Sequence, residues 1–219
     1  MTSTGSGHRR RWLLRALVAL VALVPGCSRE SPYSPLPAGS VVLAFGDSVT
    51  WGTGAGRGED FPSRLAEHSG WQVVNAGVPG NTATAARERL EGLLRQHDPA
   101  LVIVELGGND FLRRRPDADV EADLRDILRT VQDHGAIPVL VAVPRLSLLR
   151  ATVGALKDAP LYARLAEAEG VLLVPDVLSG VLSQESLRAD TIHPNKAGYE
   201  VLAEELAAAL RQAGLLSPT

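Results

Sequence analysis

The chain has 219 residues, which is enough for one α/β domain with a well-buried core and leaves little for a second domain. Hydrophobic residues make up 45% of the sequence and charged residues 21%, values near those of soluble globular proteins. This composition, with a formal charge of −3, argues against a disordered chain and against a membrane protein with many spanning helices. We therefore expect one folded domain.

The N-terminal residues differ from the rest of the chain. A basic segment precedes the apolar run 16–24; its arginines are Arg9, Arg10, Arg11 and Arg15. This run is much shorter than the roughly 20 residues of a spanning helix, so the pattern predicts a secretory signal peptide over residues 1–26. Residues 8–13 also resemble a twin-arginine export signal, although a generic basic segment explains them nearly as well.

Cys27 is the only cysteine, and it follows the sequence Leu-Val-Pro-Gly. The stretch resembles a bacterial lipobox, which would imply cleavage before Cys27 and attachment of lipid to its thiol. A free cysteine beside a cleavage site is the alternative, since a single cysteine forms no internal disulfide. Residues 27–40 are rich in proline and serine and predict a lipid-anchored tether. We expect an exported protein, lipid-anchored to the bacterial cell envelope on its periplasmic or outer-surface face.

Removal of the signal peptide would make the protein more acidic. Residues 1–26 contain four arginines and no acidic residue, so the formal charge would change from −3 to −7. Nucleic-acid binding relies on Lys and Arg that neutralise phosphates. Nucleic acid is therefore not an expected partner.

Apolar runs of strand length alternate with segments of helical periodicity. Strands are expected at residues 41–45, 71–75, 101–106, 137–143 and 171–174. Helices are expected at 62–68, 84–97, 120–134 and 160–169, with a last helix that begins at Pro194. Continuous apolar strands separated by helices imply a parallel sheet buried on both faces. Right-handed crossovers then predict a three-layer α/β/α sandwich with a five-stranded parallel sheet over residues 41–214.

The segment 144–157, after the fourth expected strand, has several leucines but no clean helical period. Leu146, Leu148 and Leu149 could line a groove for an acyl chain, because the fourth strand ends at the ligand-binding rim of the sheet. Packing in the core is an equal alternative for these leucines. Both interpretations remain open at this point.

Four unusual segments fall at the rim where the strands of an open parallel sheet end, which is where such sheets bind ligands. Ser48 lies in "GDS" after the first strand, and Gly77 in "NAGVPGN" after the second. Asn109 lies in "ELGGND" after the third strand. Asp190 and His193 lie in "DTIHPN", just before the last helix.

These residue types suit acyl transfer. A serine hydroxyl becomes a good nucleophile when an imidazole takes its proton, and a third group must hold the imidazole in the right tautomer. Ser48, His193 and Asp190 can fill these catalytic roles. The developing oxyanion needs preset donors, for which we expect an oxyanion hole made of the N–H of Ser48, the N–H of Gly77 and the amide of Asn109.

Taken singly, these residues have ordinary explanations. Ser48 could be a helix N-cap, Asn109 an Asx turn, and the Asp190–His193 pair a surface pair. Their coincidence at one rim favours catalysis. Asp47 is expected only to bind the turn backbone, and the run 113–115 of three arginines to form a solvated loop. No pair of His, Asp or Glu has metal-ligand spacing, so neither a metal nor a cofactor is expected.

The four segments, in this order, resemble the blocks of the GDSL or SGNH hydrolase family over residues 41–210. The resemblance implies a flavodoxin-like SGNH hydrolase fold. The Ser, Gly, Asn and His of the family name would fall on Ser48, Gly77, Asn109 and His193, and the family's Asp on Asp190. The "VELGGND" and "IHPN" stretches resemble the bacterial periplasmic branch of acyl-CoA thioesterases, arylesterases and lysophospholipases.

We therefore expect a serine esterase that hydrolyses small-molecule acyl esters or thioesters, of lipid, aryl or acyl-CoA type, through an acyl-enzyme on Ser48. A carbohydrate O-deacetylase of the same family is one alternative, and a non-catalytic carbohydrate- or lipid-binding lipoprotein is another. A nucleotide-binding protein is disfavoured because the glycine-rich phosphate motifs are missing after the first strand. The G-x-S-x-G elbow of α/β-hydrolases is also missing, since position 50 is Thr50.

Overall fold

The computed structural model describes residues 1–2, 32–145 and 156–218. The predicted signal peptide and lipidation site at Cys27 fall outside these residues, as do Leu146, Leu148 and Leu149. The described part from residue 32 onward belongs to one compact unit, Ser31–Thr219. Within the described ranges, no helix combines the length and the apolar character that crossing a membrane requires.

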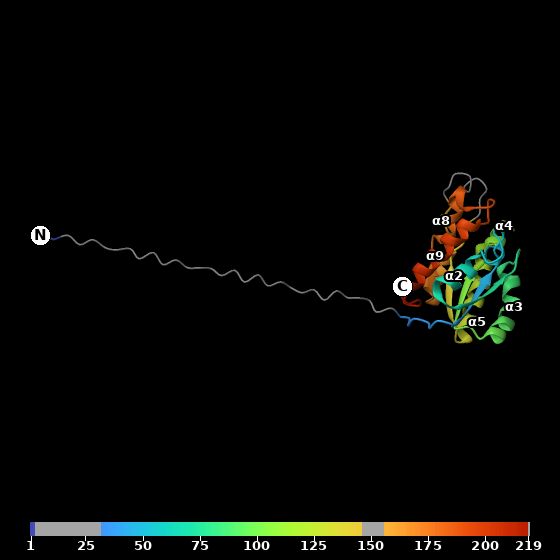
Figure 1. The fold of residues 1–219 in the computed structure, drawn as a ribbon, viewed down its shortest axis with the longest axis horizontal. Coiled ribbons are helices and arrows are strands. Elements are labelled where there is room, and N and C mark those ends of the chain that lie inside the picture. The colour runs from blue at the N-terminus through green and yellow to red at the C-terminus, as the bar shows by residue number, and fades with distance from the viewer. Residues whose placement is uncertain (3–31, 146–155, 219) are drawn as a thin grey trace. The chain divides into compact units, whose positions relative to one another are not determined.

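Five strands form a single parallel sheet, which confirms the predicted architecture (Figure 1). They are β1 (Val41–Gly46), β2 (Gln72–Gly77), β3 (Leu101–Glu105), β4 (Ile137–Val141) and β5 (Leu172–Val174). Their order across the sheet is β2-β1-β3-β4-β5. Gly46 pairs in register with both Gly77 and Glu105, so the carboxyl ends of three neighbouring strands meet at one rim.

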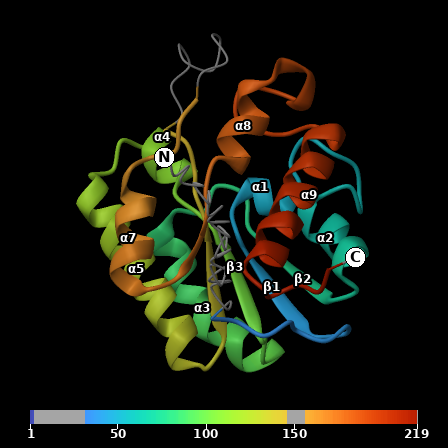
Figure 2. The same cartoon turned by 90° about the vertical axis from the view of Figure 1, so that its left-hand side faces the viewer.

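Helices cover both faces of the sheet and complete the three predicted layers (Figure 2). One face carries α2 (Phe61–Ser69), α8 (Val177–Ser183) and α9 (Lys196–Gln212). The other face carries α3 (Ala83–His97), α5 (Asp117–Asp133) and α7 (Leu161–Glu169). Shorter elements are α1 (Ser48–Trp51), α4 (Gly108–Leu112) and the 3-10 turn η1 (Glu185–Leu187). Because α1 and α4 directly follow β1 and β3, they lie at the rim.

The two central strands form the middle of the core. Residues 42–45 of β1 and 101–104 of β3 are fully buried. Each apolar side chain of this kind contributes roughly 1.5–3 kcal/mol when it leaves water. The strands that carry the expected "GDS" and "GGND" segments are therefore the best-packed part of the sheet.

The last helix begins at Lys196 and not at Pro194 as predicted. Asn195 is its N-cap, and the Asn195 Oδ1 atom accepts the N–H of Gly198 at 3.0 Å. Asparagine is among the best N-cap residues, since its side chain binds an otherwise unsatisfied helical N–H. Pro194 lies before the cap and forms an isolated antiparallel bridge with Arg188.

The folded unit extends beyond both ends of the predicted domain. The N–H of Leu36 donates to the carbonyl of Leu215 at 2.9 Å, and the indole of Trp71 donates to the carbonyl of Leu36. Leu215 and Leu216 are buried. The tether prediction is therefore wrong for residues 36–40, which are attached to the domain by backbone hydrogen bonds.

Candidate active site

A tight turn at the end of β1 presents Ser48. The strand ends at Gly46, and Ser48 is the first residue of α1. Asp47 caps this helix, because its Oδ1 atom accepts the N–H of Val49 at 3.0 Å. A Cβ atom on Gly46 would lie 1.9 Å from the Thr50 hydroxyl, so only glycine lets the helix fold back this closely over the strand.

The three residues predicted as catalytic are hydrogen-bonded in a chain. The Nε2 atom of His193 lies 3.0 Å from the Ser48 hydroxyl, and its Nδ1 atom lies 2.8 Å from Asp190 Oδ2. An ionised Asp190 only accepts, which places the proton of a neutral imidazole on Nδ1 and leaves Nε2 free to accept from Ser48. The arrangement is that of a nucleophile, a base and an orienting carboxylate.

Asp190 is itself held by its own loop. Its Oδ1 atom accepts the N–H groups of Ile192 and His193, each at 2.8 Å. Partial burial raises the pKa of Asp190, but the hydrogen bonds from the His193 ring and from these two N–H groups outweigh it and lower the pKa below its usual value. The carboxylate is therefore ionised whenever the imidazole is a competent base.

Asn109 reaches the nucleophile from the neighbouring strand. Gly107, with a φ of +123°, makes the turn after β3, and a Cβ atom there would lie 2.1 Å from the Tyr162 hydroxyl. The Tyr162 hydroxyl donates to the carbonyl of Leu106 at 2.6 Å and so holds the start of this turn in place. The Nδ2 atom of Asn109 donates to Asp47 Oδ2 at 2.9 Å.

The structure contradicts the oxyanion role predicted for Gly77. Its N–H already donates to Asn75 Oδ1 at 3.0 Å. Gly77 is instead required for packing, since a Cβ atom there would lie 2.2 Å from the backbone nitrogen of Trp51. Gly80, in the turn that follows β2, has a φ of +80°, and its N–H has no hydrogen-bond partner among the described residues.

The hydrogen-bonded residues Ser48 and His193 line a pocket with mostly apolar walls. Its polar lining includes Ser48, Asn109 and His193. Its apolar walls are formed by Leu112, Val143, Pro144, Leu178, Leu182 and Ile192. Leu112 remains about half exposed, so one wall of the pocket reaches solvent. These walls offer apolar contacts to the part of a ligand that lies next to Ser48, and burying each CH₂ group there releases about 0.8 kcal/mol.

Two buried carboxyl groups lie close to Ser48, and neither was expected to be catalytic. Burial raises the pKa of Asp47 to about 6, although the hydrogen bonds from Val49 and Asn109 oppose the shift. Burial, and then the charge of Asp47, raise the pKa of Glu105 well above its usual value. Glu105 Oε2 accepts the Thr50 hydroxyl at 2.8 Å, whereas Oε1 has no partner within the described part of the chain.

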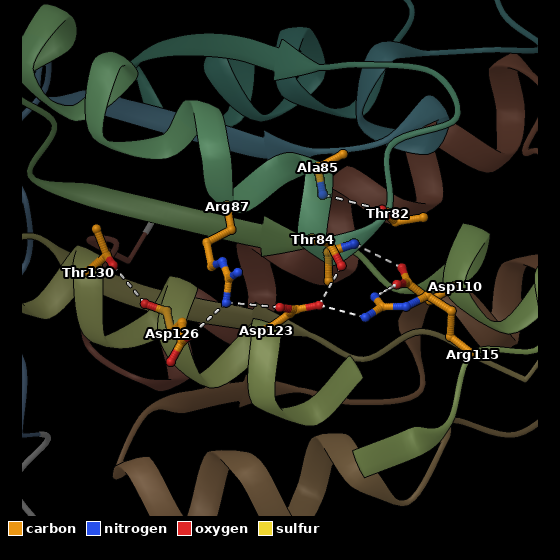
Figure 3. Close-up of polar contacts among 10 residues, drawn as sticks. Thr82, Thr84, Ala85, Arg87, Asp110, Arg115, Asp123, Asp126 and Thr130 are labelled. Atoms are coloured by element: carbon orange, nitrogen blue, oxygen red, sulfur yellow. Dashed lines mark hydrogen bonds and ion pairs between the residues drawn. The ribbon is translucent and has the colours of Figure 1, made fainter. Parts of the chain in front are cut away.

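Of the three arginines after Asn109, Arg113 and Arg114 are exposed, as expected for a solvated loop, whereas Arg115 is half-buried and ion-paired. Arg115 binds Asp110, and its second amino group binds Asp123 at 2.8 Å (Figure 3). Asp110 Oδ2 in turn accepts the N–H of Ala83 at 3.0 Å. The "GGND" turn is therefore joined by ion pairs and hydrogen bonds to α3 and α5.

One cluster elsewhere has the composition of a metal site. His68, Glu200 and Glu204 offer ligand atoms that all lie within 4.8 Å of one another. However, Glu200 already binds His68 at 3.1 Å and the guanidinium of Arg64 at 3.1 Å. A cation would have to displace the positive charge of Arg64, so the contacts fit an ion-pair cluster at the α2–α9 contact.

Known proteins resemble this chain over most of its length. Residues 44–201 match the GDSL-like Lipase/Acylhydrolase family. The Escherichia coli protein named thioesterase 1/protease 1/lysophospholipase L1 is 34% identical over 182 residues, which are 80% of this chain and 85% of that protein. An arylesterase of Vibrio mimicus is 31% identical, over 76% of this chain and 86% of its own.

A solved structure resembles the fold as well. The esterase AlinE4, described as a member of the SGNH-hydrolase family, has a TM-score of 0.61 and 31% identity, and the match covers 84% of this chain and all of that one. The order of the motifs, the parallel sheet and these similarities agree. The chain belongs to the GDSL-like lipase/acylhydrolase family.

Proposed function

We propose that this enzyme hydrolyses acyl esters or thioesters with an apolar acyl or aryl group through an acyl-enzyme on Ser48. The observation that supports the proposal most is the hydrogen-bonded chain from Ser48 to His193 to Asp190 beside an apolar pocket. The names of the relatives, which include thioesterase, lysophospholipase and arylesterase, favour the same substrate class.

The first half of the reaction forms the acyl-enzyme. His193 Nε2 takes the proton of Ser48 as its Oγ atom bonds to the carbonyl carbon of the substrate, and the carbonyl oxygen becomes an oxyanion. Collapse of this tetrahedral intermediate breaks the bond to the alcohol or thiol. The imidazolium of His193 gives its proton to that leaving group. Asp190 stabilises the imidazolium while it exists.

The second half releases the acid. A water molecule loses a proton to His193 Nε2 and attacks the acyl carbon of the ester on Ser48. A second tetrahedral intermediate collapses, the bond to Ser48 Oγ breaks, and that oxygen regains its proton from His193. The carboxylic acid leaves and the enzyme returns to its starting state.

We assign the oxyanion donors as the N–H of Ser48, the N–H of Gly80 and the second N–H of the Asn109 amide. No partner for the Ser48 or Gly80 N–H occurs among the described residues. Asn109 uses one amide hydrogen on Asp47 and keeps the other. Gly80 replaces Gly77 in this assignment, because the Gly77 N–H is occupied by Asn75.

We also propose that the protein is exported and anchored to the cell envelope by lipid on Cys27. The support is the sequence alone: a basic segment, a short apolar run and one cysteine at the end of that run. Growth of the producing bacterium with a labelled fatty acid tests the anchor. Label should enter the wild-type protein and be missing from a Cys27→Ser variant, whereas equal labelling of both would contradict the proposal.

A panel of p-nitrophenyl esters from acetate to palmitate, with acyl-CoA thioesters beside it, tests the substrate class. We expect hydrolysis that increases with chain length beyond acetate, and a loss of activity in Ser48→Ala of at least roughly 10,000-fold. Activity confined to acetyl groups, including acetylated sugars, would favour a carbohydrate O-deacetylase. Unchanged activity in Ser48→Ala would overturn the mechanism.

A further inference from the structure

The Asp47 side chain binds two separate parts of the site. Its Oδ1 atom accepts the N–H of Val49 at 3.0 Å and caps α1. Its Oδ2 atom accepts the Asn109 amide at 2.9 Å, across 62 positions of the sequence. The two residues meet because Gly46 of β1 and Glu105 of β3 are register partners. Asp47 directly follows β1, and Asn109 lies in α4, the first helix after β3.

We propose that Asp47 is a positioning residue for the oxyanion donor: its carboxylate holds one N–H of the Asn109 amide, so that the other N–H points to the site beside Ser48. The inference rests on the proposed function, because it deepens the account of the same site. It gives Asp47 a second role besides the cap of α1, which is the bond to the turn backbone expected from the sequence.

The chemistry of the pair determines which way the Asn109 amide faces. An ionised carboxylate has only acceptor atoms, whereas the amide has a nitrogen with two donors and an oxygen with none. If the amide were rotated by half a turn, its oxygen would face the Asp47 carboxylate and the two would repel. The carboxylate therefore selects the orientation in which the amide nitrogen faces Asp47 and its second N–H is left for the oxyanion site that we propose beside Ser48.

Burial makes this selection effective. Asp47 is only 3% exposed, so little water competes for its oxygens. A hydrogen bond to a charged acceptor is about twice as strong as one between neutral groups. The pKa of Asp47, raised to about 6 by burial, leaves the carboxylate predominantly ionised in an assay at about pH 8.

The substitution Asp47→Asn separates the two roles. Asparagine caps helices about as well as aspartate, so its oxygen can still accept the N–H of Val49. Its amide nitrogen then faces the nitrogen of Asn109, and the two donors repel. Asp47→Ser is the second variant, because serine also caps helices but is too short to reach Asn109.

A double-mutant cycle with a short p-nitrophenyl ester at about pH 8 tests the proposal. We expect Asp47→Asn to lower kcat roughly 10- to 100-fold with little change in KM, and Asn109→Ala to lower it roughly 100- to 1,000-fold. Because Asp47 acts through Asn109, adding Asp47→Asn to Asn109→Ala should cost less than about threefold more. Asp60→Asn, the same exchange at the N-cap of α2, should leave kcat within about twofold.

Thermal unfolding of each variant, read by circular dichroism, shows whether it folds, and Asp47→Ser replaces Asp47→Asn in the cycle if the latter does not. Independent, multiplicative losses from the two substitutions would overturn the proposal, and so would a wild-type kcat for Asp47→Asn. A wild-type kcat for Asn109→Ala would also overturn it. In that case, lost activity in Ser48→Ala would still support the proposed function, so the two failures are distinguishable.

Discussion

The nucleophile side of the active site and its acid–base side differ in how deeply they lie in the fold. Ser48 and Asn109 follow the two central strands and rest on Asp47, Thr50 and Asp110, which are 3%, 0% and 0% exposed. The acid–base side is a surface loop, where 54% of the Asp190 side chain is exposed. That loop is held by short local bonds, such as the N–H of Ala189 on the carbonyl of His193 at 2.9 Å.

This difference separates catalysis from stability. A change on the acid–base side removes a group that few other residues depend on, so we expect activity to fall while the fold persists. A change on the nucleophile side disturbs buried hydrogen bonds, so we expect stability to fall as well. Substitutions on the two sides should therefore change kcat and the free energy of unfolding in opposite proportions.

The largest effect is expected for His193→Ala. Loss of the base should lower kcat roughly 10,000- to 1,000,000-fold, as removal of the base does in other serine hydrolases. The melting temperature should stay near that of the wild type, because the side chain is bound mainly to Ser48 and Asp190. Steady-state kinetics and calorimetry measure both, and a loss of less than about tenfold would contradict the role of His193.

Asp190→Asn should have the next largest effect. The amide can present a donor to Nδ1 and favour the wrong tautomer, so kcat should fall roughly 100- to 10,000-fold. The unfolding midpoint should again change little, since the side chain is half exposed. If kcat were unchanged, the orienting group would have to be another residue.

Tyr162→Phe, on the nucleophile side, should lower stability more than it lowers kcat. It removes the buried hydroxyl that supports the Asn109 turn through the carbonyl of Leu106. The free energy of unfolding should fall by about 1–3 kcal/mol, because that carbonyl loses its partner, while kcat falls less than about tenfold. Tyr199→Phe, which loses a bond to the carbonyl of Thr53, is the matched control for a lost buried hydroxyl. A catalytic loss without a stability loss would contradict the contrast.

The smallest effect is expected for Glu105→Gln, and it depends on pH. Burial raises the pKa of Glu105 above its usual 4.5, so the folded state holds a proton that the unfolded state releases as the pH rises above that value. The wild type should therefore lose stability relative to the Gln variant between about pH 5 and pH 8. Denaturant titrations at both pH values measure the free energy of unfolding of the wild type and of the Gln variant. If the wild type became more stable relative to the variant as the pH rises, Glu105 would be ionised in the folded state.

Much of the fold could be predicted from the sequence. Apolar runs identified all five strands. They are continuous in the central strands β1 and β3, because strands buried on both faces have no polar alternation. The short helices α1 and α4 were not predicted, since four or five residues show no periodicity. The start of α9 was misplaced because Pro194 is a common first helical residue, whereas the capping oxygen of Asn195 determines where the helix begins.

The residues that follow strands could be placed at the site from the sequence. The direction of a backbone N–H, such as that of Gly77, could not. Ser48 and Asn109 lie close together because they follow neighbouring strands that end at one rim. The loop before α9 brings Asp190 and His193 to the same rim. The direction of the Gly77 N–H depends on Asn75 two residues earlier, and side-chain bonds of this local kind were the missed signal. The second bond of Asp47 depends on register between β1 and β3, which one sequence does not display.

Reaction with a fluorophosphonate, followed by mass spectrometry of the intact protein and its peptides, shows whether Ser48 is the nucleophile. We expect one phosphonyl adduct per chain, on the peptide that contains Ser48, with labelling abolished in Ser48→Ala and much slower in His193→Ala. A wild-type enzyme that hydrolyses esters but carries no adduct on Ser48, or that is labelled equally fast in His193→Ala, would contradict this expectation.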